Sequence, residues 1–208
     1  MNTPVGRETL AVKVADSDPG VDTAENDRSI PGGWEIWLFV LGEMTIFVVM
    51  FATYAYSRSD NPDAFAAAQE HVHKGFGAIN TLVLLTSSLF VVLALTAVRF
   101  GERGVAYRLL YAAMGCGVLF MVIKSIEWTI EIRAGLTFGS SAFGSYYYMM
   151  CALHLGHVVV GLIALFAIVT HLRRRPEPNW QLVDSAAIYW HMVDLLWIIL
   201  FPLLYLVR

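Results

Sequence analysis

Residues 187–197, AIYWHMVDLLW, place His191 and Asp194 three residues apart in a segment that is otherwise apolar enough to cross a lipid bilayer. A charged side chain at the centre of such a segment costs about 2.5–3.5 kcal/mol to insert, whereas each Leu contributes only about 0.5 kcal/mol in favour. Ionisable groups at that depth therefore seldom face lipid, and they mark a candidate site inside a helix bundle. We predict that this segment is a membrane helix whose polar stripe faces protein.

The composition extends this interpretation to the whole chain. Of its 208 residues 57% are hydrophobic and only 15% are charged, and the mean hydropathy is +0.59. Soluble domains have about 25% charged residues. Cys116 and Cys151 both fall in apolar segments and indicate no disulfide framework. The chain is predicted to be an integral membrane protein.

Five apolar stretches reach the length of about 20 residues that one membrane crossing requires. The connections between them are short, and there is neither an internal repeat nor a second soluble domain. We therefore predict an all-α fold, a single bundle of five transmembrane helices in which sequence neighbours are antiparallel. The predicted spans are Trp34–Tyr56, Gly77–Val98, Ala106–Glu131, Gly144–His171 and Asp184–Val207.

The region before the first span is polar. Residues 1–33 contain six acidic and three basic side chains and no apolar core, so they do not form a signal peptide. We predict a disordered cytoplasmic tail over residues 1–33 and one transmembrane domain over residues 34–208.

Basic residues set the expected orientation. They gather on the side of the membrane where the first span begins, which the positive-inside rule assigns to the cytoplasm. The N-terminus is thus predicted to be cytoplasmic and the C-terminus periplasmic or extracellular. The residues on the predicted cytoplasmic side are Arg28, Arg99, Arg103, Arg108, Arg173, Arg174 and Arg175, and those opposite are Arg58, Lys74, Arg133 and Arg208.

Helical phasing divides the last span into two faces. One face is polar and aromatic and is expected to meet protein, with Asp194 accepting hydrogen bonds from buried donors. The other is aliphatic and is expected to meet lipid. The first face comprises Ala187, Trp190, His191, Asp194, Trp197, Ile198 and Phe201, and the second Met192, Val193, Leu195, Leu196, Ile199, Leu200 and Leu203.

Polar side chains also lie within the other four spans, and their depth predicts two clusters. Glu43, His191 and Asp194 fall in the inner half or near the middle, so Glu43 is expected to face the last span. Lys124, Glu127, His154 and His157 fall in the middle or outer half, so Glu127 is expected to face the fourth span. Lys124 is expected either to pair with Glu127 or to snorkel outward. The second span offers Asn80, Thr81, Ser87 and Ser88 for interhelical hydrogen bonds.

Functional alternatives exist for these residues. His154 and His157, spaced i and i+3, are candidate metal ligands with Glu127 or His191, and either could bind haem together with His191. Glu43, Glu127 and Asp194 are candidates for a proton path. The simpler interpretation is structural pairing between helices, which we favour. His71 and His73 fit a solvated loop, and Arg173–Arg175 fit a topology signal that also contacts anionic lipid.

The same segments resemble, in order, the helices of subunit III of haem–copper oxidases. The resemblance covers residues 34–208 and rests on YWHMVDLLW (189–197), HLGHVVVG (154–161), INTLVLLTSS (79–88) and KSIEW (124–128), with Glu43 matching a buried carboxylate. This chain lacks two N-terminal helices of the long form, so the lipid cleft of the long form is expected to be incomplete. Five-helix forms include the NorE-like proteins associated with nitric oxide reductase, which residues 80–88, 146–148 and 200–206 resemble most.

The resemblance implies an accessory subunit with no catalysis of its own. It would support the stability, assembly or proton uptake of a haem–copper catalytic subunit I-like partner in a bacterial cytoplasmic membrane. Haem and copper or iron would belong to that partner, this chain holding no cofactor beyond a bound phospholipid. Its partners would include membrane lipids and no nucleic acid. Two alternatives from other classes are a self-contained haem or metal electron carrier and a small transporter. No phosphate-binding Gly-rich loop, nucleophile elbow or zinc-protease motif is present in the sequence.

Overall fold

The computed structural model describes residues 32–70, 72–175 and 177–207, and over these residues the chain is helical. Five helices are long and apolar enough to cross a membrane, which confirms the predicted fold class. The predicted tail lies outside the described residues except for Gly32 and Gly33. The helices are α1 (Gly33–Asp60), α2 (Pro62–Gln69), α3 (Lys74–Arg99), α4 (Arg103–Arg133), α5 (Ala142–Arg174), α6 (Trp180–Phe201) and a π-helical turn, η1 (Pro202–Leu206).

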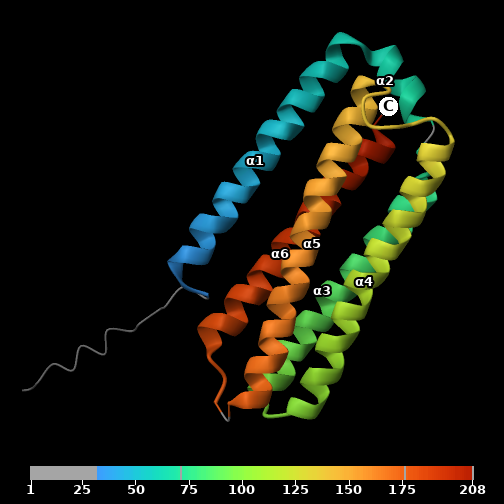
Figure 1. Ribbon diagram of the computed structural model, residues 1–208. Coiled ribbons are helices and arrows are strands. Elements are labelled where there is room, and N and C mark those ends of the chain that lie inside the picture. The colour runs from blue at the N-terminus through green and yellow to red at the C-terminus, as the bar shows by residue number, and fades with distance from the viewer. Residues whose placement is uncertain (1–31, 71, 176, 208) are drawn as a thin grey trace, which may run out of the picture.

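The five long helices form one elongated bundle (Figure 1). Consecutive long helices run in opposite directions, as the short connections predict. The helix α6 packs against α1, α3 and α5, and α4 packs against α3 and α5. The described chain begins and ends at opposite ends of the bundle (Figure 1). Which end faces the cytoplasm stays a prediction.

The short helix α2 is absent from the predicted spans. It begins at Pro62, which follows Asn61 and fits the first helical turn because its missing N–H has no partner there. Its Phe65 side chain is buried against Tyr54 and Phe143, and Gln69 Nε2 donates to the Leu204 carbonyl at 2.8 Å. The segment between α1 and α3 is therefore folded against the end of the bundle.

The helix α6 is more deeply enclosed than its phasing predicts. Trp190, Asp194 and Trp197 are buried as expected. The prediction of a lipid-facing aliphatic side is wrong for Met192, Val193, Leu196 and Leu200, which are also buried, whereas Leu195 and Ile199 are exposed. Ile198, predicted to meet protein within the chain, is exposed as well. A helix with neighbours on three sides buries both its faces. Phasing identifies which residues share a face but not how many neighbours surround the helix.

Two glycines allow α4 and α5 to approach the Trp190 indole. A Cβ on Gly161 would lie 2.6 Å from Trp190 Cε3, and one on Gly117 would lie 2.9 Å from Trp190 Cη2. Since carbon atoms in contact sit about 3.5–4.0 Å apart, neither position has room for a methyl group. Small residues permit such close approach between membrane helices.

Gly161→Ala is expected to destabilise the protein by about 1–3 kcal/mol through overpacking against Trp190. The matched control is Gly156→Ala in the same helix, where an added Cβ meets nothing within 4 Å. Both changes alter helix propensity equally, so the difference in thermal unfolding midpoint in detergent isolates the packing cost. Equal midpoints for the two variants would contradict this packing.

Candidate functional site

A polar cluster lies inside the bundle around Lys124, and we call it the Lys124 cluster. It consists of Lys124, Glu127 and Glu131 of α4, Tyr147 of α5 and Tyr205 of η1, and all five are buried. The Lys124 amino group donates to Glu127 Oε2 at 3.1 Å, to Tyr147 Oη at 2.9 Å and to Tyr205 Oη at 2.5 Å. Both tyrosine hydroxyls in turn donate to Glu127 Oε1, at 3.2 Å and 2.6 Å.

The hydrogen bonding of Lys124 is thereby complete. An ammonium group has three donors, and each of them meets an oxygen from a different residue. A buried charge is tolerated only when it is paired and hydrogen-bonded. The arrangement leaves the amino group no free donor for a substrate, so it suits the joining of three elements of the bundle.

Local sequence explains how these groups meet. The spacing 124, 127 and 131 places the three α4 side chains on one face. Tyr205 lies in the π-helical turn η1, a form that occurs mostly as single-turn insertions at special sites. The predictions that Lys124 pairs with Glu127 and that Glu127 faces the fourth span are confirmed, whereas outward snorkelling of Lys124 is wrong.

Sequence reasoning did not place Tyr147 and Tyr205 in this cluster. A buried tyrosine hydroxyl needs a hydrogen-bond partner, and that requirement is the signal that could have linked them to the charged stripe of α4. Glu131 is also fully buried beside Glu127 and Lys124, and its carboxyl oxygens have no hydrogen bond of good distance and angle to a described residue.

Glu43 forms a second polar contact, with a different partner from the one predicted. His157 Nε2 lies 3.0 Å from Glu43 Oε2, and His157 Nδ1 lies 2.7 Å from the Leu153 carbonyl. The expectation that Glu43 meets His191 and Asp194 is therefore wrong. Glu43 nevertheless faces the last span as predicted, because it lies close enough to Tyr189 of α6 for its charge to act on that hydroxyl.

Hydroxyl groups of α3 accept hydrogen bonds from the indole N–H groups of α6. Trp190 Nε1 donates to Ser87 Oγ and Trp197 Nε1 donates to Thr81 Oγ1, both at 3.1 Å. Asp194 was the expected acceptor for buried donors, and this expectation is wrong for both indoles. Ser87 also donates to the Ala113 carbonyl of α4 at 2.9 Å.

His191 and Asp194 have fewer contacts within the chain. A hydrogen bond of 2.6 Å joins His191 Nδ1 to Ser88 Oγ. Neither carboxyl oxygen of Asp194 has a hydrogen bond of good distance and angle within the described part of the chain, and its hydrogen-bonding neighbour is the Ser88 hydroxyl. The buried amide of Asn80 likewise finds no partner among the described residues. The interhelical bonds expected of the second span are thus made by Thr81, Ser87 and Ser88.

The two histidines of α5 occupy different surroundings. His154 is fully buried between the rings of Phe120, 5.5 Å away, and Trp197, 5.2 Å away. His157 instead meets Glu43. Across residues 32–70, 72–175 and 177–207, no three His, Cys, Asp or Glu side chains converge as a metal site would require. The ligand set proposed from the i, i+3 spacing is not assembled.

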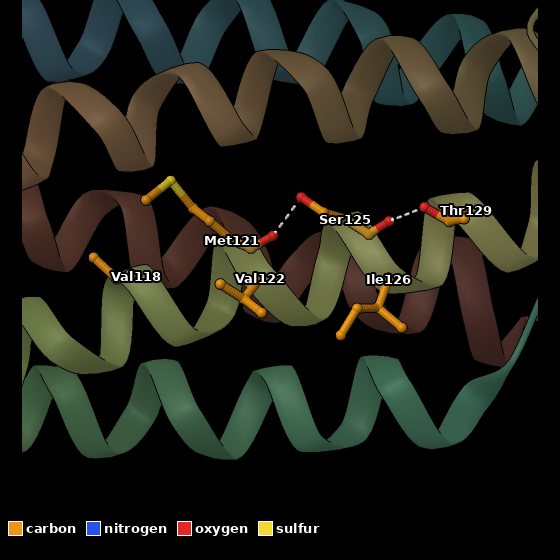
Figure 2. Close-up of a pocket in the computed structure, with 6 residues that line it drawn as sticks. All are labelled: Val118, Met121, Val122, Ser125, Ile126 and Thr129. Carbon is orange, nitrogen blue, oxygen red and sulfur yellow. Dashed lines mark hydrogen bonds between the residues drawn. The ribbon is translucent and has the colours of Figure 1, made fainter.

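The outer surface of α4 has a different character. A shallow hollow of about 330 Å³ is lined by α4 alone (Figure 2), by Val118, Met121, Val122, Ser125, Ile126 and Thr129. The Ser125 hydroxyl donates to the Met121 carbonyl, and the Thr129 hydroxyl donates to the Ser125 carbonyl, both at 2.8 Å. Because both hydroxyls bond to their own helix, this face is compatible with lipid.

Fold and buried contacts together define a multi-pass membrane protein whose ionisable groups mainly join helices. Comparison with known proteins agrees with this class. Residues 24–207 match the family described as cytochrome c oxidase subunit III. The chain belongs to this family, and it is a multi-pass protein of the bacterial cytoplasmic membrane.

Three relatives illustrate the range of the family. Cytochrome c oxidase subunit 3 of Bacillus sp. (strain PS3) is 29% identical over 179 residues, which are 82% of this chain and 83% of that protein. Quinol oxidase subunit 3 of Bacillus spizizenii is 27% identical, over 82% and 84%. Heme-copper oxidase subunit I+III of Aeropyrum pernix is 27% identical over 83% of this chain, which spans only 22% of that longer protein.

Replacing Lys124 by Met is expected to destabilise the protein by about 3–5 kcal/mol, because it leaves the Glu127 carboxylate buried without its cation. The double variant Lys124→Met with Glu127→Gln removes both charges and is expected to regain part of that loss. The measurement is denaturant unfolding in detergent, with exposed Ser125→Ala of the same helix as control. Additive effects of the two substitutions would show that the ion pair is not coupled.

Proposed function

We propose that this protein is a non-catalytic subunit that supports the assembly and stability of a haem–copper oxidase-type complex. The observation that carries the proposal is the Lys124 cluster. Its amino group has all three donors engaged within the chain, so the most prominent charged group of the bundle holds helices together. Family membership and relatives named as third subunits of cytochrome c and quinol oxidases support the same role.

The proposed partner is a catalytic subunit I-like protein, which would hold the haem and the copper or iron. One relative carries the name subunit I+III, which indicates that the two types of subunit occur in one chain. Both an aerobic oxidase and a nitric oxide reductase are candidate complexes, and the sequence details shared with NorE-like proteins favour the latter.

The charge distribution supports the orientation proposed from the sequence. At the end of the bundle where α3 finishes and α4 begins, Arg103 Nη1 donates to the Leu172 and Arg175 carbonyls at 3.3 and 3.0 Å. There the Arg173 guanidinium lies 5.6 Å from the ring centre of Tyr107. We propose that this end is cytoplasmic and contacts anionic lipid headgroups.

An affinity-tagged chain, expressed with the genes that neighbour its own and solubilised in mild detergent, is expected to co-purify with a haem-containing subunit. Mass spectrometry of that subunit distinguishes an aerobic oxidase from a nitric oxide reductase. After the two proteins are separated, the haem Soret absorption should remain entirely with the partner. Deleting the gene for this chain should lower the amount of assembled complex several-fold.

Three results would overturn the proposal. A Soret band or stoichiometric metal in the separated chain would identify an electron carrier. Solute flux through proteoliposomes containing only this chain would identify a transporter. Absence of any co-purifying haem protein, with an unchanged amount of complex in the deletion strain, would remove the supporting role.

A further inference from the structure

One face of the bundle leaves a ring nitrogen without a hydrogen bond at mid-membrane depth. We call it the α3/α6 face. It contains the partly exposed residues Ser88 and His191, and around them the exposed apolar residues Leu85 and Val92 of α3 and Leu195 and Ile198 of α6. His191 lies close to the middle of the span Trp180–Leu206.

His191 uses only one of its ring nitrogens within the chain. Nδ1 is bonded to Ser88, while Nε2 makes no hydrogen bond with any described residue. A polar group moved into hydrocarbon without a hydrogen bond costs several kcal/mol. Ionisable side chains at this depth accordingly face protein or a water-filled space. A partly exposed imidazole among apolar side chains therefore indicates that protein covers this face.

Asp194 is a further polar group of α6, enclosed in the bundle beside His191. It lies one helical turn from His191 and is only 4% exposed. Its carboxyl oxygens have no hydrogen bond of good distance and angle to a described residue. Buried polar groups in native proteins nearly always have a partner. The carboxyl is enclosed and does not reach the surface, so His191 Nε2 is the group through which a partner can bond to this face.

Two other polar sites near the bundle surface do not share this property. Glu43 and His157 are partly exposed, but they bond to each other at 3.0 Å. The hydroxyls in the hollow on α4 bond to carbonyls of their own helix (Figure 2). Both of these surfaces can meet lipid without losing a hydrogen bond, whereas the α3/α6 face cannot.

We propose that the α3/α6 face is the docking surface for a transmembrane helix of the catalytic subunit, which presents a polar side chain to His191 Nε2. Lipid acyl chains have no donors or acceptors, so they cannot satisfy this group at mid-membrane. The choice of occupant rests on the proposed function, since the complex supplies a partner helix in the membrane.

Site-specific photo-cross-linking in native membranes tests the face directly. A benzophenone amino acid at Leu195 or Ile198 is expected to form an adduct with the haem-containing subunit. The same amino acid at Val122 or Ile126, on the hollow of α4, should form none. Adducts only from α4, or a homodimer adduct from α6, would overturn the proposal. If the partner co-purifies but no adduct forms from α6, the docking proposal is wrong and the proposed function is left intact.

A pair of substitutions separates docking from helix packing inside the chain. His191→Leu removes the surface group, and Ser88→Ala removes the same internal hydrogen bond but keeps the imidazole. With the chain itself at unchanged abundance, His191→Leu is expected to lower the co-purified partner at least fivefold, and Ser88→Ala less than twofold. Equal losses would mean that the bond between α3 and α6 is what matters, and the docking role would be wrong.

Discussion

The Lys124 ammonium group is the constraint on which the rest of the bundle depends. Its side chain is 1% exposed, and a cation at that depth requires oxygen atoms on every side. Those oxygens come from Glu127 on the same helix, from Tyr147 of α5 and from Tyr205 of η1. The positions of α4, α5 and the end of α6 are consequently linked through one amino group. The π-helical turn is the local deformation that brings Tyr205 to it.

A second group of contacts holds α6 against its neighbours. The Trp190 indole fills the space left by Gly117 and Gly161 and donates to Ser87 of α3. Hydrophobic attraction between helices is weak in lipid, so close packing and interhelical hydrogen bonds must supply specificity. Trp190 provides both at one position. The polar chemistry of this protein is therefore used largely to position helices, which fits a subunit whose partner holds the redox centres.

The sequence was sufficient for the number of spans, their approximate bounds and the identity of most buried polar residues, because hydropathy and helical period act locally. Apart from the contacts of Glu127 with Lys124 and with the fourth span, it was insufficient for pairing. Glu43 bonds to His157 and lies near Tyr189 of the last span rather than bonding to His191 or Asp194, because helix rotation is set by tertiary packing. The indoles met hydroxyls instead of Asp194, because helix rotation is set by tertiary packing. The helix α2 was missed because only eight residues form it and they carry no transmembrane signal.

The separation of Lys124 from its partners along the chain bears on the order in which the protein can be inserted into the membrane. Tyr205 follows Lys124 by 81 residues, and Tyr147 follows it by 23. A ribosome therefore delivers α4 to the membrane before either hydroxyl exists. Glu127, only three residues away, enters with the same helix and can neutralise the charge during that interval. The short-range ion pair makes α4 insertable, and the tyrosines then fix it in the finished bundle.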